Sequence, residues 1–166
     1  MQSSGISSVA LAKIGMMQEP FGIAEAEFLE SGLYKPITDL SALKAVIQPV
    51  YESGDLIDLI AWSIIKPKDW HWRTGNGWAL GIDAIWKGGV HEDFNSISIH
   101  TTPFDWLAAE GEGITILDWN APQIRMLADF GQLVCFDRRI SSHISKTLAQ
   151  PFQAPQIVIE GDHRAF

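Results

Sequence analysis

The residues best placed for chemistry are polar side chains that directly follow apolar segments in the second half of the sequence. In an open parallel sheet, ligands bind beyond the carboxyl ends of the strands, because loops and helix N-termini converge there. We therefore expect any functional site in this half to lie at that edge. The residues that would reach it are His100, Thr101, Thr102, Asp118, Asn120, Asp137, Arg138, Asp162 and His163.

The most specific chemistry at this edge is a pair of carboxylates. If the strands that precede Asp118 and Asp137 are neighbours, both side chains can share a divalent cation, as magnesium sites that meet phosphate do. His100 or His163 would add a base. This arrangement predicts a metal-dependent, phosphate-handling enzyme with Mg²⁺ as its cofactor.

Helix capping is the competing explanation for several of these residues. Thr102, Asn120 and Asp137 each stand where a helix N-cap is wanted, and a cap accounts for them completely. Asp118 is the least explained of the group. The sequence contains no Walker loop and no HExxH, GxSxG or GxGxxG motif that would favour catalysis.

A second candidate site is aromatic and lies in the middle of the chain. Asn76-Gly77 predicts a hairpin turn between strands at 70–74 and 78–82. On that hairpin His71 and Arg73 share a face with Trp78, and an exposed Arg73–Trp78 pair would stack a planar ligand or a partner's side chain. Large indoles equally suit a core. The tryptophans concerned are Trp62, Trp70, Trp72, Trp78 and Trp86.

The elements that would position these residues differ between the two halves. Apolar residues recur at helical spacing around Phe21–Leu29 and Leu40–Val50, which predicts two short N-terminal helices. Residues 55–65 are apolar enough for a strand covered on both faces. Asp58 inside that strand needs a partner, and we expect its role to be structural.

The second half predicts a βαβαβαβ pattern. Strands are expected at 96–101, 114–117, 133–136 and 156–160, and the helices between them at about 103–110, at 121–130 and around Ile140–Leu148. We therefore expect an α/β fold with a mixed sheet, an antiparallel hairpin or meander in the centre and a largely parallel C-terminal part. The chain would form one domain over residues 1–166, with residues 1–8 flexible.

Composition narrows the function classes. Of the 166 residues, 46% are hydrophobic and 19% are charged, which indicates a well-filled core. The net charge of −8 disfavours binding of duplex nucleic acid. Cys135 lies in an apolar run and fits a buried hydrophobe better than a nucleophile. No apolar run is long enough to span a membrane and no secretory signal is evident, so we expect a soluble, cytoplasmic protein.

Several stretches resemble small, uncharacterised proteins of alphaproteobacteria and their prophages. The resemblance covers about two thirds of the chain and implies a bacterial or mobile-element setting. Those proteins have no assigned activity, so no residue role is carried over. The stretches are DLIDLIAW (55–62), RTG (73–75), TPFDWL (102–107) and GITILDW (113–119).

The sequence favours a non-catalytic accessory or interaction module that uses Arg73, Trp78 and His71. Its partner would be a protein, or a second copy of the chain in a homodimer. The metal-dependent enzyme built on Asp118, Asp137 and His100 is one alternative. Binding of a nucleotide or single-stranded nucleic acid to the tryptophan face, aided by Lys66, Lys68 and Arg73, is another.

Overall fold

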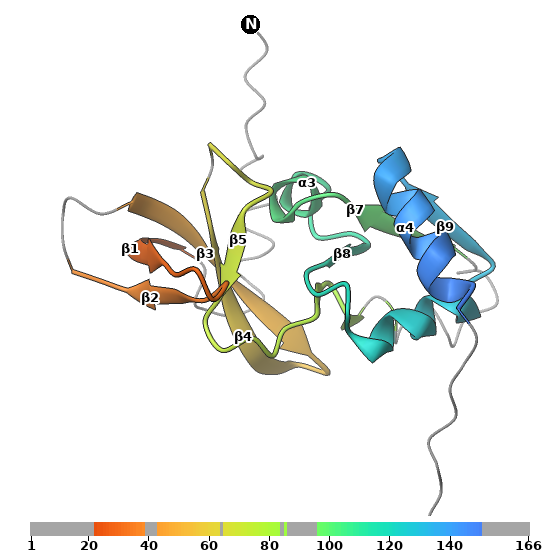
Figure 1. Cartoon of the computed structure of the whole chain (residues 1–166), viewed down its shortest axis with the longest axis horizontal. Coiled ribbons are helices and arrows are strands. Elements are labelled where there is room, and N and C mark those ends of the chain that lie inside the picture. The colour runs from red at the N-terminus through yellow and green to blue at the C-terminus, as the bar shows by residue number, and fades with distance from the viewer. Residues whose placement is uncertain (1–21, 39–42, 64, 84, 86–95, 151–166) are drawn as a thin grey trace, which may run out of the picture.

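The computed structural model describes residues 22–38, 43–63, 65–83, 85 and 96–150, which form a mixed α/β structure with two β-sheets (Figure 1). Sheet A is antiparallel and has the strand order β2-β1-β3-β4-β5. Its strands are β1 (Gly22–Phe28), β2 (Tyr34–Pro36), β3 (Leu43–Glu52), β4 (Asp55–Trp62) and β5 (Trp70–Trp72).

Sheet B is mixed and has the strand order β6-β8-β7-β9. Both β8 and β9 run parallel to the central strand β7, whereas β6 is antiparallel to β8. The strands are β6 (Ala79–Leu80), β7 (Ser96–His100), β8 (Ile114–Ile116) and β9 (Gln132–Cys135). The helices are α3 (Pro103–Ala108), the 3-10 helix η1 (Pro122–Asp129) and α4 (Arg138–Leu148).

The two predicted N-terminal helices are wrong, because their residues form β1 and β3. In β1, glutamates and small apolar residues alternate, and this two-residue period places Ala24, Ala26 and Phe28 on one face. β3 continues into β4 through a tight turn in which Ser53 and Gly54 have φ angles of 55° and 86°. Two successive positive φ angles are what a two-residue hairpin turn requires.

Sheet A curls until its outer strands meet. Leu33, just before β2, forms an isolated bridge with Trp72 at the end of β5, and the Trp72 N–H donates to the Gly32 carbonyl at 3.0 Å. The sheet therefore approaches a small closed barrel. Its interior is narrow, which suits alanine, and it contains Ala26, Ala45, Ala61 and Tyr34 with Phe28, Ile47 and Leu59 packed against them.

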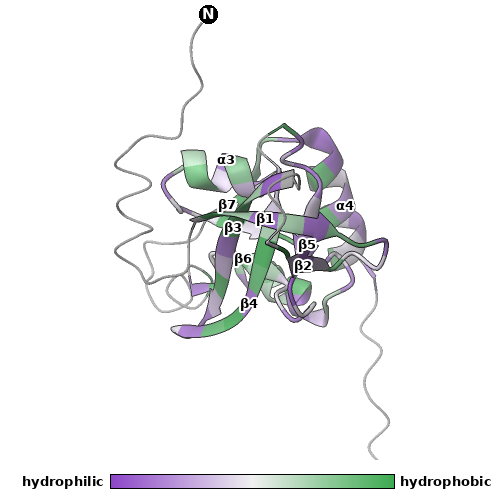
Figure 2. Cartoon of the chain, turned by 90° about the vertical axis from the view of Figure 1, so that its left-hand side faces the viewer, coloured by the Kyte–Doolittle hydropathy of each residue, from purple (hydrophilic) through white to green (hydrophobic). Residues whose placement is uncertain are grey.

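A hydrophobic cluster joins the two sheets. Val46, Ile60 and Trp62 of sheet A pack in the same cluster as Leu80 and Leu107 of the C-terminal half. α3, which contributes Leu107, lies between the sheets (Figure 1). β4 is hydrophobic along most of its length (Figure 2), as a strand covered on both faces should be. The strand predicted over residues 55–65 is present over 55–62; its second half is buried as expected, whereas Asp55, Leu56 and, beyond the strand, Ile65 are exposed.

A second hydrophobic cluster lies between sheet B and the helices η1 and α4. Its helical members are Ile124, Leu127 and Ile144, and its strand members include Ile97 and Ile114. The predicted helix at 121–130 is present as a 3-10 helix over 122–129 and has no side-chain cap, so the predicted capping role of Asn120 is wrong. The predicted strand at 156–160 lies outside the described residues.

The predicted hairpin around Asn76-Gly77 is also wrong. β5 belongs to sheet A and β6 to sheet B, so the residues between them connect two sheets instead of two paired strands. Within the part of the chain that the structure describes, no helix has both the length and the apolar character needed to cross a membrane.

Candidate functional site

The edge predicted from the sequence contains a pocket, at a position that the topology makes special. β7 leads through α3 to β8 on one side, and the chain then returns through η1 to β9 on the other side of β7. The crevice between β7 and β9 is thus a topological switch point, where open sheets bind ligands. A pocket of about 420 Å³ opens there, lined by His100, Thr101, Asp105 and Phe136.

A buried histidine and an exposed phenylalanine form the aromatic wall of this switch-point pocket. His100 is only 8% exposed, and its Nε2 lies 2.9 Å from the Glu112 carbonyl oxygen. Because a carbonyl oxygen only accepts, His100 Nε2 carries a proton and donates it to this hydrogen bond, which fixes the orientation of the ring. Phe136 is 69% exposed and stacks on His100, with ring centroids 5.5 Å apart and an interplanar angle of 19°.

The polar wall of the pocket belongs to the start of α3. The Thr102 hydroxyl accepts from the Asp105 N–H at 3.0 Å and donates to the Asp105 carboxylate at 2.8 Å. The predicted cap at Thr102 is therefore confirmed. One oxygen of Asp105 is engaged in this cap, which fixes the side chain at the pocket wall.

The predicted pairing of Asp118 with Asp137 does not occur, because β7 lies between the strands that precede them. Two interstrand spacings of about 4.8 Å separate those strands. Asp137 caps α4 by accepting from the Arg139 N–H at 2.6 Å, and Asp118 accepts from the Asn120 N–H at 2.9 Å. Both carboxylates thus serve local turns, and no group of three metal-binding side chains occurs among the described residues.

The aromatic site predicted at Arg73, Trp78 and His71 is not assembled as an exposed face. Trp78 is 4% exposed and belongs to the core beside sheet B, whereas Arg73 is exposed. The exposed Arg73–Trp78 pair is therefore absent. His71 stacks on Phe28 with ring centroids 4.4 Å apart, on the barrel-interior face of sheet A. Burial lowers the pKa of His71, and the charge of Asp69 offsets part of this effect.

Asp58 organises the loop that was expected to be a hairpin turn. Its carboxylate accepts backbone N–H groups from Thr74, Gly75, Asn76 and Gly77 at 2.8–3.2 Å, and from Leu59 at 2.7 Å. Burial alone would raise the pKa of Asp58, but these bonds outweigh it and lower the pKa. The structural role expected from the sequence is confirmed, with backbone groups as the partners instead of a basic side chain.

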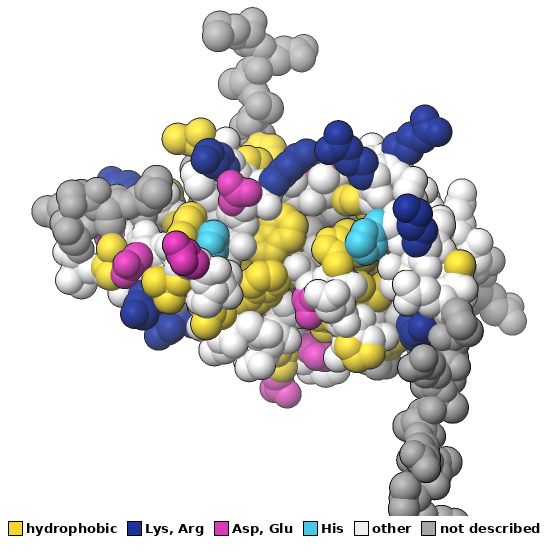
Figure 3. Space-filling model, viewed as in Figure 1, with side chains coloured by type: hydrophobic (Ala, Val, Ile, Leu, Met, Phe, Trp, Pro, Cys, Tyr) yellow, Lys and Arg dark blue, Asp and Glu magenta, His cyan; other side chains and the backbone are white. Residues whose placement is uncertain are grey.

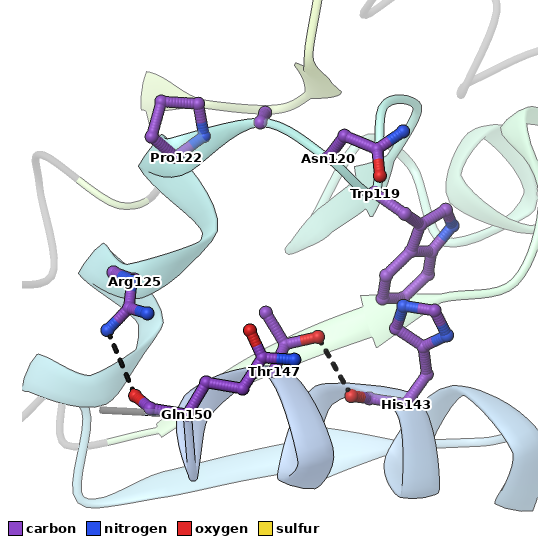
Figure 4. A pocket seen from close by; sticks show the side chains of 8 residues that line it. Trp119, Asn120, Pro122, Arg125, His143, Thr147 and Gln150 are labelled. Carbon is purple, nitrogen blue, oxygen red and sulfur yellow. Dashed lines mark hydrogen bonds between the residues drawn. The ribbon is translucent and has the colours of Figure 1, made fainter. Parts of the chain in front are cut away.

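A second pocket, which the sequence did not predict, lies between α4 and the residues that lead into η1 (Figure 4). Its volume is about 330 Å³. The available signal was modest: His143 and Thr147 are four residues apart and so share a face of one helix. The described residues that line it are Trp119, Asn120, Ala121, Pro122, Arg125, His143, Thr147 and Gln150.

Cys135 directly precedes Phe136 of the switch-point pocket in the sequence and fits the structural role expected for it. It is partly buried at the end of β9, and burial raises the pKa of its thiol. A raised pKa keeps the thiol protonated and therefore weakly nucleophilic.

Comparison of the chain with protein-family models, with curated proteins and with solved structures finds no match.

Proposed function

We propose that this protein is a non-catalytic binding module, an accessory component of the bacterial or prophage kind that the sequence resemblance implies. Its binding surface would be the switch-point pocket of sheet B. Its partner would be a protein that inserts an apolar or aromatic side chain beside Phe136 and carries acidic residues next to it.

The observation that carries the proposal is the exposure of the Phe136 ring at the pocket. A ring that is 69% exposed leaves apolar surface in water, and it lies at the mouth of a pocket of ligand size. Its stacking on the buried His100 restricts its motion before binding. An aromatic residue held in this way loses little conformational entropy on association, which is the property of a binding hot spot.

The charges around Phe136 favour the acidic residues of the partner. Arg138 and Arg139 follow Phe136 closely at the start of α4 and are both exposed. Figure 3 shows lysine and arginine side chains over the region of α4. Asp105 and Asp137 also lie near, and hydrogen bonds within the two helix caps hold each carboxylate in place without removing its charge, so the partner's acidic residues would have to lie on the arginine side of Phe136. Rim charges of this kind steer encounter and select partners more than they add affinity.

The test compares Phe136→Ser with Ile23→Ser as baits in the native host. The two residues are matched, because both are 69% exposed, but Ile23 lies on β1 of sheet A. A partner captured by the wild type should lose at least about tenfold in affinity with Phe136→Ser. Ile23→Ser should bind it like the wild type. Light scattering of the same variants identifies a second copy of the chain as the partner.

Three results would contradict the proposal. The first is a wild type that captures no partner and is monomeric. The second is unchanged partner binding by Phe136→Ser, and the third is an equal loss of binding in both variants. The last result would place the interaction away from the switch-point pocket or attribute it to surface hydrophobicity in general.

A further inference from the structure

The pocket between η1 and α4 is a separate cavity with its own chemistry. It is walled on one side by the chain from Trp119 to Pro122 and on the other by His143, Thr147 and Gln150 (Figure 4). Its volume of about 330 Å³ lies near the lower end of the range for small-molecule sites. That size suits a single small ligand instead of a long cofactor.

One end of the pocket is aromatic. The Trp119 and His143 rings are in contact, with centroids 4.5 Å apart and an interplanar angle of 57°. Trp119 also packs against the core cluster of sheet B, so the indole is held in place from behind. Two tilted rings form a corner in which a planar ligand can stack on one ring and place its edge against the other.

Apart from Ala121 and Pro122, the remaining described lining is polar, and Arg125 gives it a positive charge. Figure 4 shows Arg125 across the pocket from the two rings, with its Nη1 donating to the Gln150 carbonyl at 3.3 Å. Asn120 and Gln150 supply side-chain amides, each with donors and an acceptor. None of the described lining residues is acidic. The described lining therefore favours a ligand that is planar, rich in hydrogen-bonding groups and negatively charged.

We infer that this pocket binds a nucleoside monophosphate. Its base lies at the Trp119–His143 corner, where the amides meet the polar edge of the base, and its phosphate meets the Arg125 guanidinium. Stacking on an aromatic side chain accepts any base, whereas the arginine requires the anion. This site is distinct from the switch-point pocket and does not depend on the proposed function.

The test follows the indole N–H signal of Trp119 by NMR, assigned with Trp119→Phe, during titration with AMP, GMP, CMP and UMP. At least one nucleotide should shift this signal. Adenosine, ribose 5-phosphate and inorganic phosphate each lack part of the ligand and should bind at least about tenfold more weakly, because each loses either the stacking or the charge-assisted contact. A short single strand titrated in parallel distinguishes a free nucleotide from one within a chain.

Two arginine variants separate the site from general charge. Arg125→Gln should weaken nucleotide binding at least about tenfold, whereas Arg139→Gln removes the same charge from the start of α4, outside the pocket, and should change affinity less than about twofold. Phe136→Ser should bind nucleotide like the wild type. If Arg125→Gln does not fold, His143→Gln replaces it and should weaken binding through the lost ring.

The inference is overturned if no nucleotide moves the Trp119 signal at millimolar concentration. It is also overturned if inorganic phosphate binds as tightly as AMP, or if Arg139→Gln weakens binding as much as Arg125→Gln does. Either of these two results would assign the effect to unspecific anion attraction.

Discussion

At the scale of single residues, the buried carboxylate of Asp58 is stabilised by backbone N–H groups and not by a basic side chain. Asp58 is 4% exposed and joins β4 to the loop from Thr74 to Gly77, which leads from sheet A to sheet B. Gly77 packs tightly here, because a Cβ there would lie 3.1 Å from the Val50 Cγ1 and 3.2 Å from the Asp58 Cβ, so a larger residue would require these neighbours to shift by a few tenths of an ångström. One side chain therefore fixes the passage of the chain between its two sheets.

Replacing Asp58 by asparagine should destabilise the fold by about 3 kcal/mol or more at neutral pH, because the amide group turns a donor toward backbone donors. The lowered folded pKa means that this contribution is present above the unfolded value of about 3.9 and is lost as the pH falls through the folded value. Urea unfolding should thus show the difference between wild type and variant shrinking below about pH 4.

Asp55→Asn is the matched control, since Asp55 is exposed at the start of the same strand. It should change the free energy of unfolding by less than about 0.5 kcal/mol. An equal effect of the two variants, or a difference that stays constant into acid, would contradict the role assigned to Asp58.

His71 should make the fold sensitive to pH near neutrality. Its Nδ1 is buried without a hydrogen-bond partner, and burial lowers its pKa. The unfolded chain therefore takes up the proton first, so the free energy of unfolding should be highest above about pH 6.5 and fall as the pH decreases from there. His71→Phe keeps a ring against Phe28 and should remove this dependence.

Chemical unfolding between pH 5 and pH 8 measures the effect of His71→Phe, at roughly constant salt. His143→Gln leaves His71 in place and should retain the pH dependence of the wild type. A wild type whose stability is flat over this range, or a His71→Phe variant that keeps the slope, would refute the prediction.

At the scale of elements, the second half was easier to predict than the first. Thr102 and Asp137 carry local capping signals, and both start helices as expected. In the first half, spacing at i and i+4 also fits every second residue of a strand, so Ala24 and Phe28 satisfied both periods. The alternation of Glu25 and Glu27 with alanine was the better signal for β1.

A comparison of two glycines separates the stability cost of a left-handed backbone conformation from the cost of a steric clash. Gly54 and Gly113 have similar φ angles of 86° and 75°, but a Cβ at Gly54 would meet nothing within 4 Å, whereas one at Gly113 would collide with the Ser98 carbonyl of β7. Gly54→Ala should cost about 1–2 kcal/mol from the left-handed conformation alone. Gly113→Ala should cost clearly more, because β7 and β8 must also separate.

Urea midpoints of the two glycine variants provide the measurement, with m-values checked for unchanged unfolding behaviour. Equal losses would mean that the β7–β8 contact relaxes without cost. That outcome would contradict the tight approach of Gly113 to Ser98.

At the scale of the whole molecule, strand order decides which predicted site residues meet. His100 and Thr101 were expected at the carboxyl edge from local pattern alone, and both line the switch-point pocket. The separation of Asp118 from Asp137 follows from β7 lying between β8 and β9, a long-range pairing that local sequence does not encode. Phe136 was missed because an apolar residue after a strand resembles core until its exposure is known.

The bridge between Leu33 and Trp72 affects how the chain behaves while it is being synthesised. β1 to β4 leave the ribosome before β5, so the sheet they form keeps two open edges until Trp72 arrives. Open edges recruit strands from other chains, and closure removes them. We therefore expect chains that end before β5 to aggregate more readily than the full chain, because they lack the strand that closes the sheet.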